Sequence, residues 1–225
     1  MNKGFFLASL LSVSICTVQA QFKISQDIVG TPIATKPEKT FVGTEYLYDN
    51  FIKGHVLQAD EKYFNNMDLN YDVMSDRLVF LREGQEMAFK ELIKEFQLIK
   101  PKTLPVYLEV FRNGFPSYGT YTEKSYYMVL NTGKTIALKK PVKAIVEVTP
   151  YGSARSQKTV VNSELYFIYN NGQMVKVKKD KKSLLNALSD KKEPLTKFID
   201  DKKLSFKSDE DIQILLEYYN SLPAS

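Results

Sequence analysis

The sequence predicts a mainly β protein, an antiparallel β-sandwich or open barrel with short C-terminal helices packed on it. Three observations lead to this fold class. Residues 63–72 alternate apolar and polar side chains, which is typical of an antiparallel strand with one face in water. Asn170-Asn171-Gly172 separates two β-prone segments, and Asn-Gly tolerates the positive φ angles of a two-residue hairpin turn. From Asp180 onward, the apolar residues take helical spacing instead.

The first twenty residues have the features of a secretory signal peptide. Lys3 supplies the positive start, residues 5–18 are mostly apolar, and Ala20 offers a small residue at the cleavage point. This apolar stretch is too short to span a bilayer comfortably. Cys16 leaves lipidation open, although the isoleucine before it is bulkier than lipoprotein cleavage sites prefer. We therefore expect an exported protein, in the periplasm or outside the cell.

Composition and charge exclude several chemistries. The chain has 225 residues, one Cys, one His and a formal charge of +5. One Cys and one His cannot build the usual zinc site or an internal disulfide. Cleavage after Ala20 would leave 205 residues, no Cys and a charge of +4, which permits an acidic partner but does not require one. We expect no cofactor, no metal and no catalytic residues. We also expect no nucleic-acid partner, because no recognised nucleic-acid motif is present.

The β region is expected to span residues 41–178. The polar segment 21–40 before it reads as a leader, loosely attached or contributing one short edge strand. In residues 142–148, an apolar face lies opposite Lys143 and Glu147. It consists of Val142, Ala144, Val146 and Val148. The candidate strands are 55–57, 63–72, 78–81, 87–89, 93–99, 106–111, 126–130, 135–138, 142–148, 165–169 and 174–177.

Residues 179–225 are expected to form a Lys-rich helical segment packed on the β region. Asp180 and Ser208 are candidate N-caps, and Pro194 suits a first helical turn. Between Lys176 and Lys207 there are eleven Lys residues and five acidic residues. Two interpretations stay open: solvated helix faces, or a basic surface for anionic lipid or glycan. No later stretch has 18 consecutive apolar residues, so no membrane-spanning helix is expected in the mature chain.

The most acidic part of the β region is a candidate cation site. It comprises Asp68, Asn70 and Asp72 on one predicted strand face, followed by Asp76. Calcium prefers clustered oxygen ligands, but the EF-hand pattern fails at its Gly and Glu positions. The alternative is a solvent-facing strand face that runs into a turn, and the alternation of the strand favours it.

Three short motifs resemble functional sites in letters only. Gly133-Lys134-Thr135 lacks the upstream Gly and the following helix of a phosphate-binding loop, so a hairpin turn is expected. The stretch 189–192 matches the Ser-x-x-Lys of serine acyl-enzymes, but its companion motif is missing. His55 lies in a predicted strand without a nucleophile placed near it, which favours a structural histidine.

Aromatic residues gather in the middle of the chain. They could line a glycan site, but sugar platforms favour Trp, which is absent, so sheet packing is the favoured interpretation. The residues are Tyr107, Phe111, Phe115, Tyr118, Tyr121, Tyr126 and Tyr127.

Four short segments carry a resemblance to known proteins: Tyr46-Leu47-Tyr48-Asp49 with Phe51 and Gly54, Leu69-Asn70-Tyr71-Asp72 with Asp76 and Leu78, Lys182-Ser183-Leu184-Leu185, and Tyr218-Tyr219-Asn220. With these segments, the chain resembles a group of uncharacterised exported proteins of Bacteroidota bacteria. The resemblance covers most of the mature chain and implies an envelope protein. It implies no activity and no site residues.

The expected function is therefore that of a non-enzymatic periplasmic or secreted envelope protein that binds another macromolecule or has a structural role. Two alternatives stay open. One is an adaptor that contacts anionic envelope lipid or glycan through the Lys-rich segment. The other is a hydrolase that uses carboxylates alone, which would need two acidic side chains facing each other across a cleft.

Overall fold

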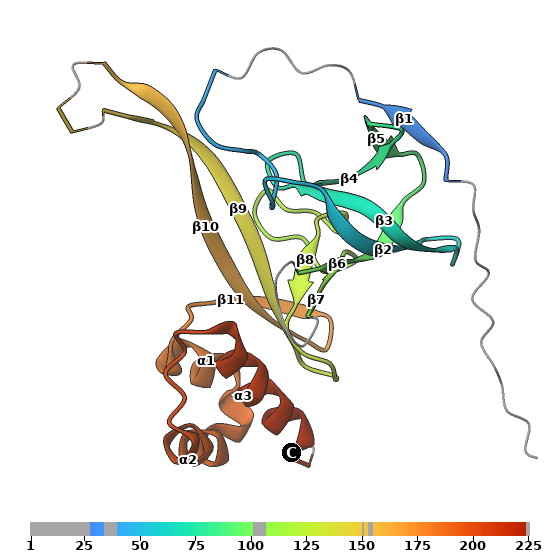
Figure 1. The fold of residues 1–225 in the computed structure, drawn as a ribbon. Helices are drawn as coiled ribbons and strands as arrows, with labels where there is room; N and C mark the ends of the chain where they lie inside the picture. The colour runs from blue at the N-terminus through green and yellow to red at the C-terminus, as the bar shows by residue number, and fades with distance from the viewer. Residues whose placement is uncertain (1–27, 34–39, 101–106, 150, 153–154, 224–225) are drawn as a thin grey trace, which may run out of the picture.

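The computed structural model describes residues 28–33, 40–100, 107–149, 151–152 and 155–223. These residues form one antiparallel sheet of eleven strands that does not close on itself, with three short helices at the C-terminal end (Figure 1). The predicted fold class is confirmed. Cys16, the rest of the predicted signal peptide and parts of the predicted polar leader lie outside the described residues. No helix in the described ranges is long and apolar enough to cross a bilayer.

The strands are β1 (Gly30–Pro32), β2 (Ile52–Gln58), β3 (Tyr63–Asp72), β4 (Arg77–Arg82), β5 (Gln85–Phe89), β6 (Ile93–Ile99), β7 (Leu108–Arg112), β8 (Tyr127–Val129), β9 (Ile136–Val148), β10 (Gln157–Asn170) and β11 (Gln173–Val177). The helices are α1 (Lys181–Ala187), the 3-10 turn η1 (Ser189–Lys191), α2 (Lys192–Lys202) and α3 (Asp209–Ser221).

The order of strands across the sheet is β1-β5-β4-β3-β2-β6-β7-β8-β9-β10-β11. The short strand β1 therefore lies at one edge and β11 at the other. Alternation along the strands separates two apolar clusters. Tyr166 and Ile168 of β10 enter the larger cluster, whereas Phe167 between them enters the smaller one, because successive side chains point to opposite faces.

The larger cluster is centred on aromatic rings from several strands. The rings of Phe96 and Phe111 stack with centroids 4.7 Å apart, and Tyr71 lies 5.5 Å from Phe96. The smaller cluster consists of Phe115, Tyr127, Leu138 and Phe167. The aromatic residues of the middle segment thus divide between two cores, as the packing interpretation predicts. Tyr107 and Tyr118 stay exposed.

Strand β9 differs from the prediction. The sequence indicates two strands, 135–138 and 142–148, separated by Lys139-Lys140-Pro141, but the structure has one strand of 13 residues. Pro141 is tolerated because of its orientation. Odd-numbered residues of β9 turn their backbone groups toward β8, as the bond from Leu130 N–H to Ala137 O shows, and β8 already ends opposite Lys139. The missing N–H of Pro141 therefore leaves no ladder bond unmade.

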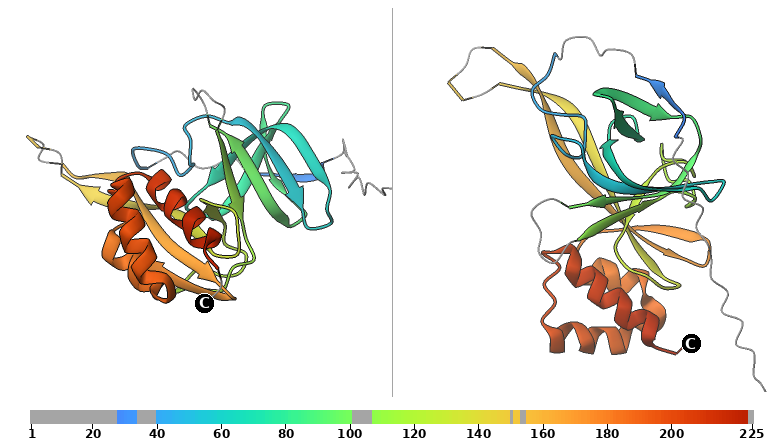
Figure 2. Two further views of the ribbon diagram at one scale, coloured as in Figure 1. Left: turned by 90° about the horizontal axis from the view of Figure 1, so that it is seen from below. Right: turned by 45° about the vertical axis from the view of Figure 1, so that its right-hand side comes forward.

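The C-terminal helices pack on the sheet as expected. Their buried leucines, including Leu184, Leu195 and Leu215, join the larger apolar cluster together with Tyr166 of β10. The Asp180 side chain accepts a hydrogen bond from Ser183 N–H at 2.8 Å, which confirms it as the N-cap of α1. Figure 2 shows the three helices grouped at one end of the sheet, beside β9, β10 and β11.

The tip of the β10–β11 hairpin has the predicted turn. Asn171 and Gly172 both have positive φ angles, 48° and 79°, as a type I′ turn requires. This hairpin places β11 against only the last five residues of β10, Tyr166–Asn170. The earlier part of β10 therefore runs past the end of β11.

Candidate binding site on the β9–β10 arm

Strands β9 and β10 extend beyond the strands next to them and form a projecting arm. The two strands pair continuously from Gln157–Val148 to Tyr169–Ile136, whereas β8 pairs with β9 only at Leu138 and Lys139. Beyond these neighbours, residues 142–149 and 155–165 form a two-stranded ribbon that extends away from the sheet (Figure 1). We call this ribbon the arm. Two-stranded ribbons are marginal in water unless something covers a face.

One face of the arm is apolar and open to solvent. Val148 is 42% exposed and Val161 is 40% exposed. Both lie on the same face as Val142, Ala144 and Val146, because Val161 pairs directly with Ala144 and positions two apart share a face. This is the apolar face predicted opposite Lys143 and Glu147. It continues the face on which Leu138 and Phe167 build the smaller core cluster.

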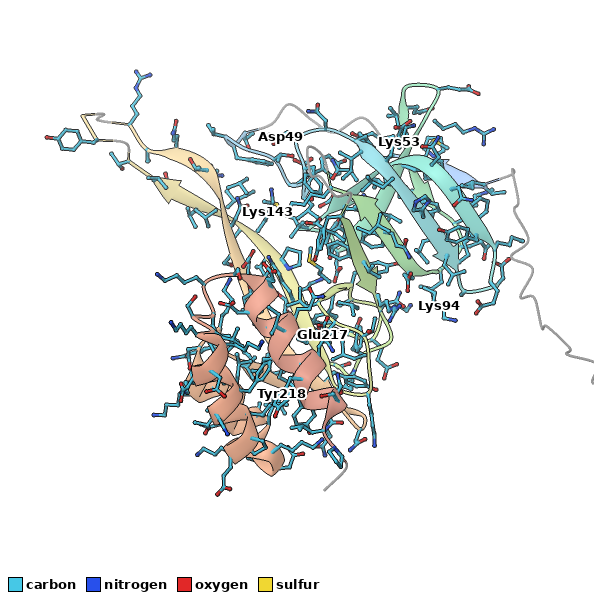
Figure 3. The ribbon with its side chains drawn as sticks, turned by 60° about the horizontal axis from the view of Figure 1, so that its bottom comes forward. Asp49, Lys53, Lys94, Lys143, Glu217 and Tyr218 are labelled. Carbon is cyan, nitrogen blue, oxygen red and sulfur yellow. The ribbon has the colours of Figure 1, made fainter. Side chains whose placement is uncertain are left out.

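The opposite face of the arm is partly covered by the segment before β2. Lys143, labelled in Figure 3, lies on this face, and its Nζ donates a hydrogen bond to Thr44 O at 3.0 Å. The same segment reaches the edge of β10, where Val42 forms a parallel bridge at Thr159. Gly43 has a φ of +108°, and a Cβ built there would lie 3.0 Å from Val160 Cβ. A side chain at this position would therefore be strained and crowded, so glycine permits the close crossing.

A buried lysine lies at the base of the arm. Lys140 of β9 is 1% exposed, and its Nζ lies 2.8 Å from Asp76 Oδ2 and 2.9 Å from both the Tyr71 hydroxyl and Tyr126 O. Three aromatic rings surround it, with centroids 5.2–5.6 Å from Nζ: Tyr71, Tyr121 and Tyr127. Burial lowers the pKa of Lys140, although the Asp76 carboxylate opposes this shift.

A lysine with a lowered pKa is a candidate nucleophile, and a cavity of about 370 Å³ lies beside it. The cavity is lined by residues of the β3–β4 turn, the segment before β8, and β9. However, the three N–H groups of an ammonium match the three acceptors around Lys140. The geometry therefore favours an anchor that ties β9 to the β3–β4 turn over a reactive amine.

The acidic strand face is not the wet surface that the sequence predicts. Asn70 is 1% exposed and Asp72 is 4% exposed, and only Asp68 keeps substantial exposure, paired with Lys53 at 2.8 Å. The segment before β2 covers this end of β3, and the bridge between Tyr46 and Asp72 fixes it there. The prediction was wrong at Asn70 and Asp72, because sequence alternation does not reveal that a distant segment lies over the strand.

Asn70 and Asp72 satisfy backbone groups instead of facing water. The Asn70 amide donates to Tyr48 O at 2.8 Å, and Asp72 Oδ1 accepts from Met74 N–H and Ser75 N–H at 3.1 Å each. These bonds hold the covering segment and the β3–β4 turn. Across the described ranges, no group of three or more His, Cys, Asp and Glu side chains is placed to hold a metal ion.

The structure places each of the three short motifs where it has a structural role. Gly133-Lys134-Thr135 leads into strand β9, not into a helix, so the hairpin-turn prediction is confirmed. Ser189 begins η1, between the helices α1 and α2, as the sequence indicates. His55 stacks on the Tyr63 ring with centroids 5.9 Å apart, a packing contact that suits a structural histidine.

Glu164 and Asp209 are two carboxylates that approach each other. The Tyr166 hydroxyl lies 2.5 Å from Glu164 Oε2 and 2.7 Å from Asp209 Oδ1, and Lys139 pairs with both carboxylates. Burial alone would raise the pKa values of both acids, but hydrogen bonds from Lys139 and Tyr166 outweigh it and lower both values. A glycosidase acid needs the opposite shift, so this pair suits a clamp between β10 and α3 better than catalysis.

The lysines of the C-terminal segment divide into two groups. Lys179 pairs with Asp209, Lys181 pairs with Asp200, and Lys191 Nζ donates to Leu222 O at 3.0 Å near the end of α3. The other eight are exposed, and none forms an ion pair with another described residue: Lys176, Lys178, Lys182, Lys192, Lys197, Lys202, Lys203 and Lys207.

The arm is the feature that the sequence alone did not reveal. The candidate strand 165–169 begins at Leu165, whereas β10 begins at Gln157. One signal was available: Thr159-Val160-Val161 is β-branched, and the apolar face of 142–148 needed a partner strand of equal length.

Comparison with known protein families, with curated proteins and with solved structures finds no match for this chain.

Proposed function

We propose that the chain is an exported, non-enzymatic envelope protein that binds another protein through the β9–β10 arm. The observation that carries this proposal is the open apolar face of the arm, where Val148 and Val161 are each at least 40% exposed. Contiguous apolar surface on a projecting element is typical of an interaction site. A partner that covers this face would also stabilise a ribbon that has few neighbours of its own.

The chemistry of the arm favours a protein over a membrane as its partner. Surfaces that insert into lipid present Trp, Phe and Leu side chains. Within the arm only Leu165 is of this kind, and it packs against the smaller core cluster; the exposed apolar side chains of the arm are Val, Ile and Ala. β-Branched side chains on a flat pleated surface suit packing against another polypeptide. The predicted signal peptide and the resemblance to exported Bacteroidota proteins support an envelope location.

The test uses paired Val→Thr substitutions, which keep shape and β propensity but add a hydroxyl. Val148→Thr together with Val161→Thr changes the arm, and Val175→Thr, at an equally exposed position on β11, is the matched control. The wild-type chain captures proteins from its own envelope fraction, mass spectrometry identifies them, and each candidate is purified and titrated. The proposal requires a partner whose Kd weakens at least tenfold for the arm variant only. Equal affinity for all three proteins would refute it.

A second candidate function is contact with anionic lipid through the Lys-rich segment. The eight exposed lysines without ion pairs in the described residues favour it. Acidic residues interleave with them on α2, however, at Glu193, Asp200 and Asp201. Co-sedimentation with vesicles containing phosphatidylglycerol tests this candidate. Binding at low salt that disappears at high salt supports it, whereas no binding at low salt, or binding insensitive to salt, excludes it.

A further inference from the structure

We propose that the partner supplies an extended, acidic segment that pairs with the open main-chain edge of β10, between Val42 and β11. This inference rests on the proposed function of the arm and specifies how the partner is held. It concerns the backbone of β10, whereas the proposed function concerns the apolar face.

The outward edge of β10 is defined by its even-numbered residues. Val42 N–H donates to Lys158 O at 2.8 Å, and Val160 N–H donates to Val42 O at 2.9 Å. Further along, β11 pairs with residues Tyr166–Asn170 on this same outward side, because β9 occupies the other side. Backbone groups of one residue in an antiparallel strand point to the same side, and the side alternates from residue to residue.

Asn162 and Glu164 lie between these two segments and continue the same alternation. Their N–H and C=O groups therefore point away from β9 toward the open edge. Among the described residues, no backbone group bonds to them there. An edge with unpaired donors and acceptors is a template for another extended chain.

The open edge of β10 can pair with an extended segment that runs either parallel or antiparallel to it. Val42 lies parallel to β10, whereas β11 is antiparallel to it. The opening runs from Val160 to Tyr166, which corresponds to about 20 Å at the usual rise per residue of a strand. A segment of about five extended residues fills this length.

The charge around the opening selects an acidic segment. Between Lys139 and Lys179 there are eight basic and two acidic residues, and three of the basic ones, Lys139, Lys140 and Lys179, are already paired with acids. On the arm, Lys143 lies directly across from Asn162, and Lys158 lies on the same face, opposite the apolar one. Alternating acidic and apolar side chains would therefore meet these two lysines on one side and the apolar face of the arm on the other.

Amide hydrogen exchange measured by NMR tests the pairing directly. The probe is a ten-residue peptide that alternates Glu and Val, and a peptide of equal length that alternates Lys and Val is its control. In the free protein, the amides of Asn162 and Glu164 should exchange fast, whereas those of Val161 and Ser163, which point to β9, should be protected. The Glu–Val peptide should slow the first two at least tenfold, and the Lys–Val peptide should not.

A matched pair of variants separates the backbone from the side chain. Asn162→Pro removes an outward N–H without removing a bond to β9, and Asn162→Ala removes only the exposed side chain. The Pro variant should lose at least tenfold in affinity for the Glu–Val peptide, and the Ala variant should bind like wild type. If the Pro variant fails to fold, methylating alternate amide nitrogens of the peptide makes the same test on the wild-type protein, with the same expected loss.

Three outcomes would overturn the inference. In the first, the peptide moves the methyl signals of Val146 and Val148 without slowing the amides of Asn162 and Glu164, which leaves the arm as a binding face but removes the strand pairing. In the second, the Lys–Val peptide protects these amides as well as the Glu–Val peptide does. In the third, Asn162→Ala weakens binding as much as Asn162→Pro. A different result would refute the proposed function: an identified partner that binds the Val148→Thr, Val161→Thr variant with the same Kd as wild type.

Discussion

Lys140 Nζ lies 2.8 Å from Asp76 Oδ2, and this ion pair joins strand β9 to the turn between β3 and β4. The two residues are 64 positions apart in the sequence, so the pair connects the early strands to the base of the arm. The Tyr71 hydroxyl donates to Asp76 Oδ1 and accepts from Lys140, which closes a small network. Buried charges of this kind stabilise only when their hydrogen bonds are complete.

Removing one partner of this pair should therefore destabilise the protein strongly. Asp76→Asn keeps the size of the side chain and suits the positive φ of 53° at this position, so it changes mainly the charge. We expect the free energy of unfolding in urea to fall by about 3 kcal/mol, because Lys140 is left buried without its counter-charge. The double variant Asp76→Asn, Lys140→Met should lose less than the two single losses added together. A loss below about 1 kcal/mol for Asp76→Asn would show that the pair is not a buried anchor.

Asn220 should link the C-terminal end of α3 to the segment that leads into β9. Its side chain accepts a hydrogen bond from Thr135 N–H at 3.0 Å and donates one to Thr135 O at 2.8 Å. Asn220→Ala should cost about 1–3 kcal/mol of unfolding free energy, because Thr135 N–H loses its partner and Thr135 O keeps only the hydrogen bond from the Asn131 amide. Asn186→Ala, at an exposed position on α1, is the control and should change stability by less than about 0.5 kcal/mol. Equal effects at the two positions would contradict this role.

Local patterns were sufficient to predict most strands and the helix caps. The period-2 pattern that marks strand β3, the Asn-Gly turn and the Asp180 cap are properties of a few neighbouring residues, and the structure has the strand, the turn and the cap. The errors arose where distant segments meet. Asn70 and Asp72 are covered by residues 45–50, and no local signal encodes that covering.

The arm and the buried lysine show the same limit of prediction from sequence. Pro141 suggested a break in the strand, but its missing N–H faces the side where β8 has already ended. The sequence shows Lys140 as one of two adjacent lysines, and only the fold distinguishes them. Lys140 turns into the tyrosine rings, whereas Lys139 on the other face pairs with Glu164 and Asp209. Strand alternation predicts opposite faces for the two lysines, but not which face is buried.

Gly172 should be required for its backbone conformation alone. Its φ is +79°, and a Cβ built at this position meets no atom within 4 Å. Gly172→Ala should therefore lower the free energy of unfolding by about 1 kcal/mol through backbone strain without any steric clash. Asn171→Gly, at the neighbouring residue with φ of 48°, should leave stability within about 0.5 kcal/mol of wild type. Thermal unfolding measures the stability of both variants. A Gly172→Ala variant as stable as wild type would exclude the type I′ turn.

The clamp around Asp209 should make the docking of α3 sensitive to acid. Asp209 and Glu164 have pKa values below their ordinary values of 3.8 and 4.5, because hydrogen bonds from Lys139 and Tyr166 outweigh the effect of burial. A carboxylate whose pKa is lower in the folded state stabilises the protein above its unfolded pKa, and this contribution is lost as the pH falls through the folded value. The expected loss therefore begins below about pH 4.5 and grows as the pH decreases further.

Asp209→Asn should remove the contribution of this carboxylate to the free energy of unfolding. At pH 7 the variant should unfold at lower urea concentration than wild type, because Lys139 and Lys179 lose a shared counter-charge. At pH 2.5 the difference between the two proteins should be smaller than at pH 7, because the stabilisation by a carboxylate with a lowered pKa decreases as the pH falls below the unfolded value. Asp201→Asn, at an exposed position on α2, is the control and should keep the difference near zero at both pH values. A difference between Asp209→Asn and wild type that does not shrink at low pH would show that Asp209 acts through packing and not through its charge.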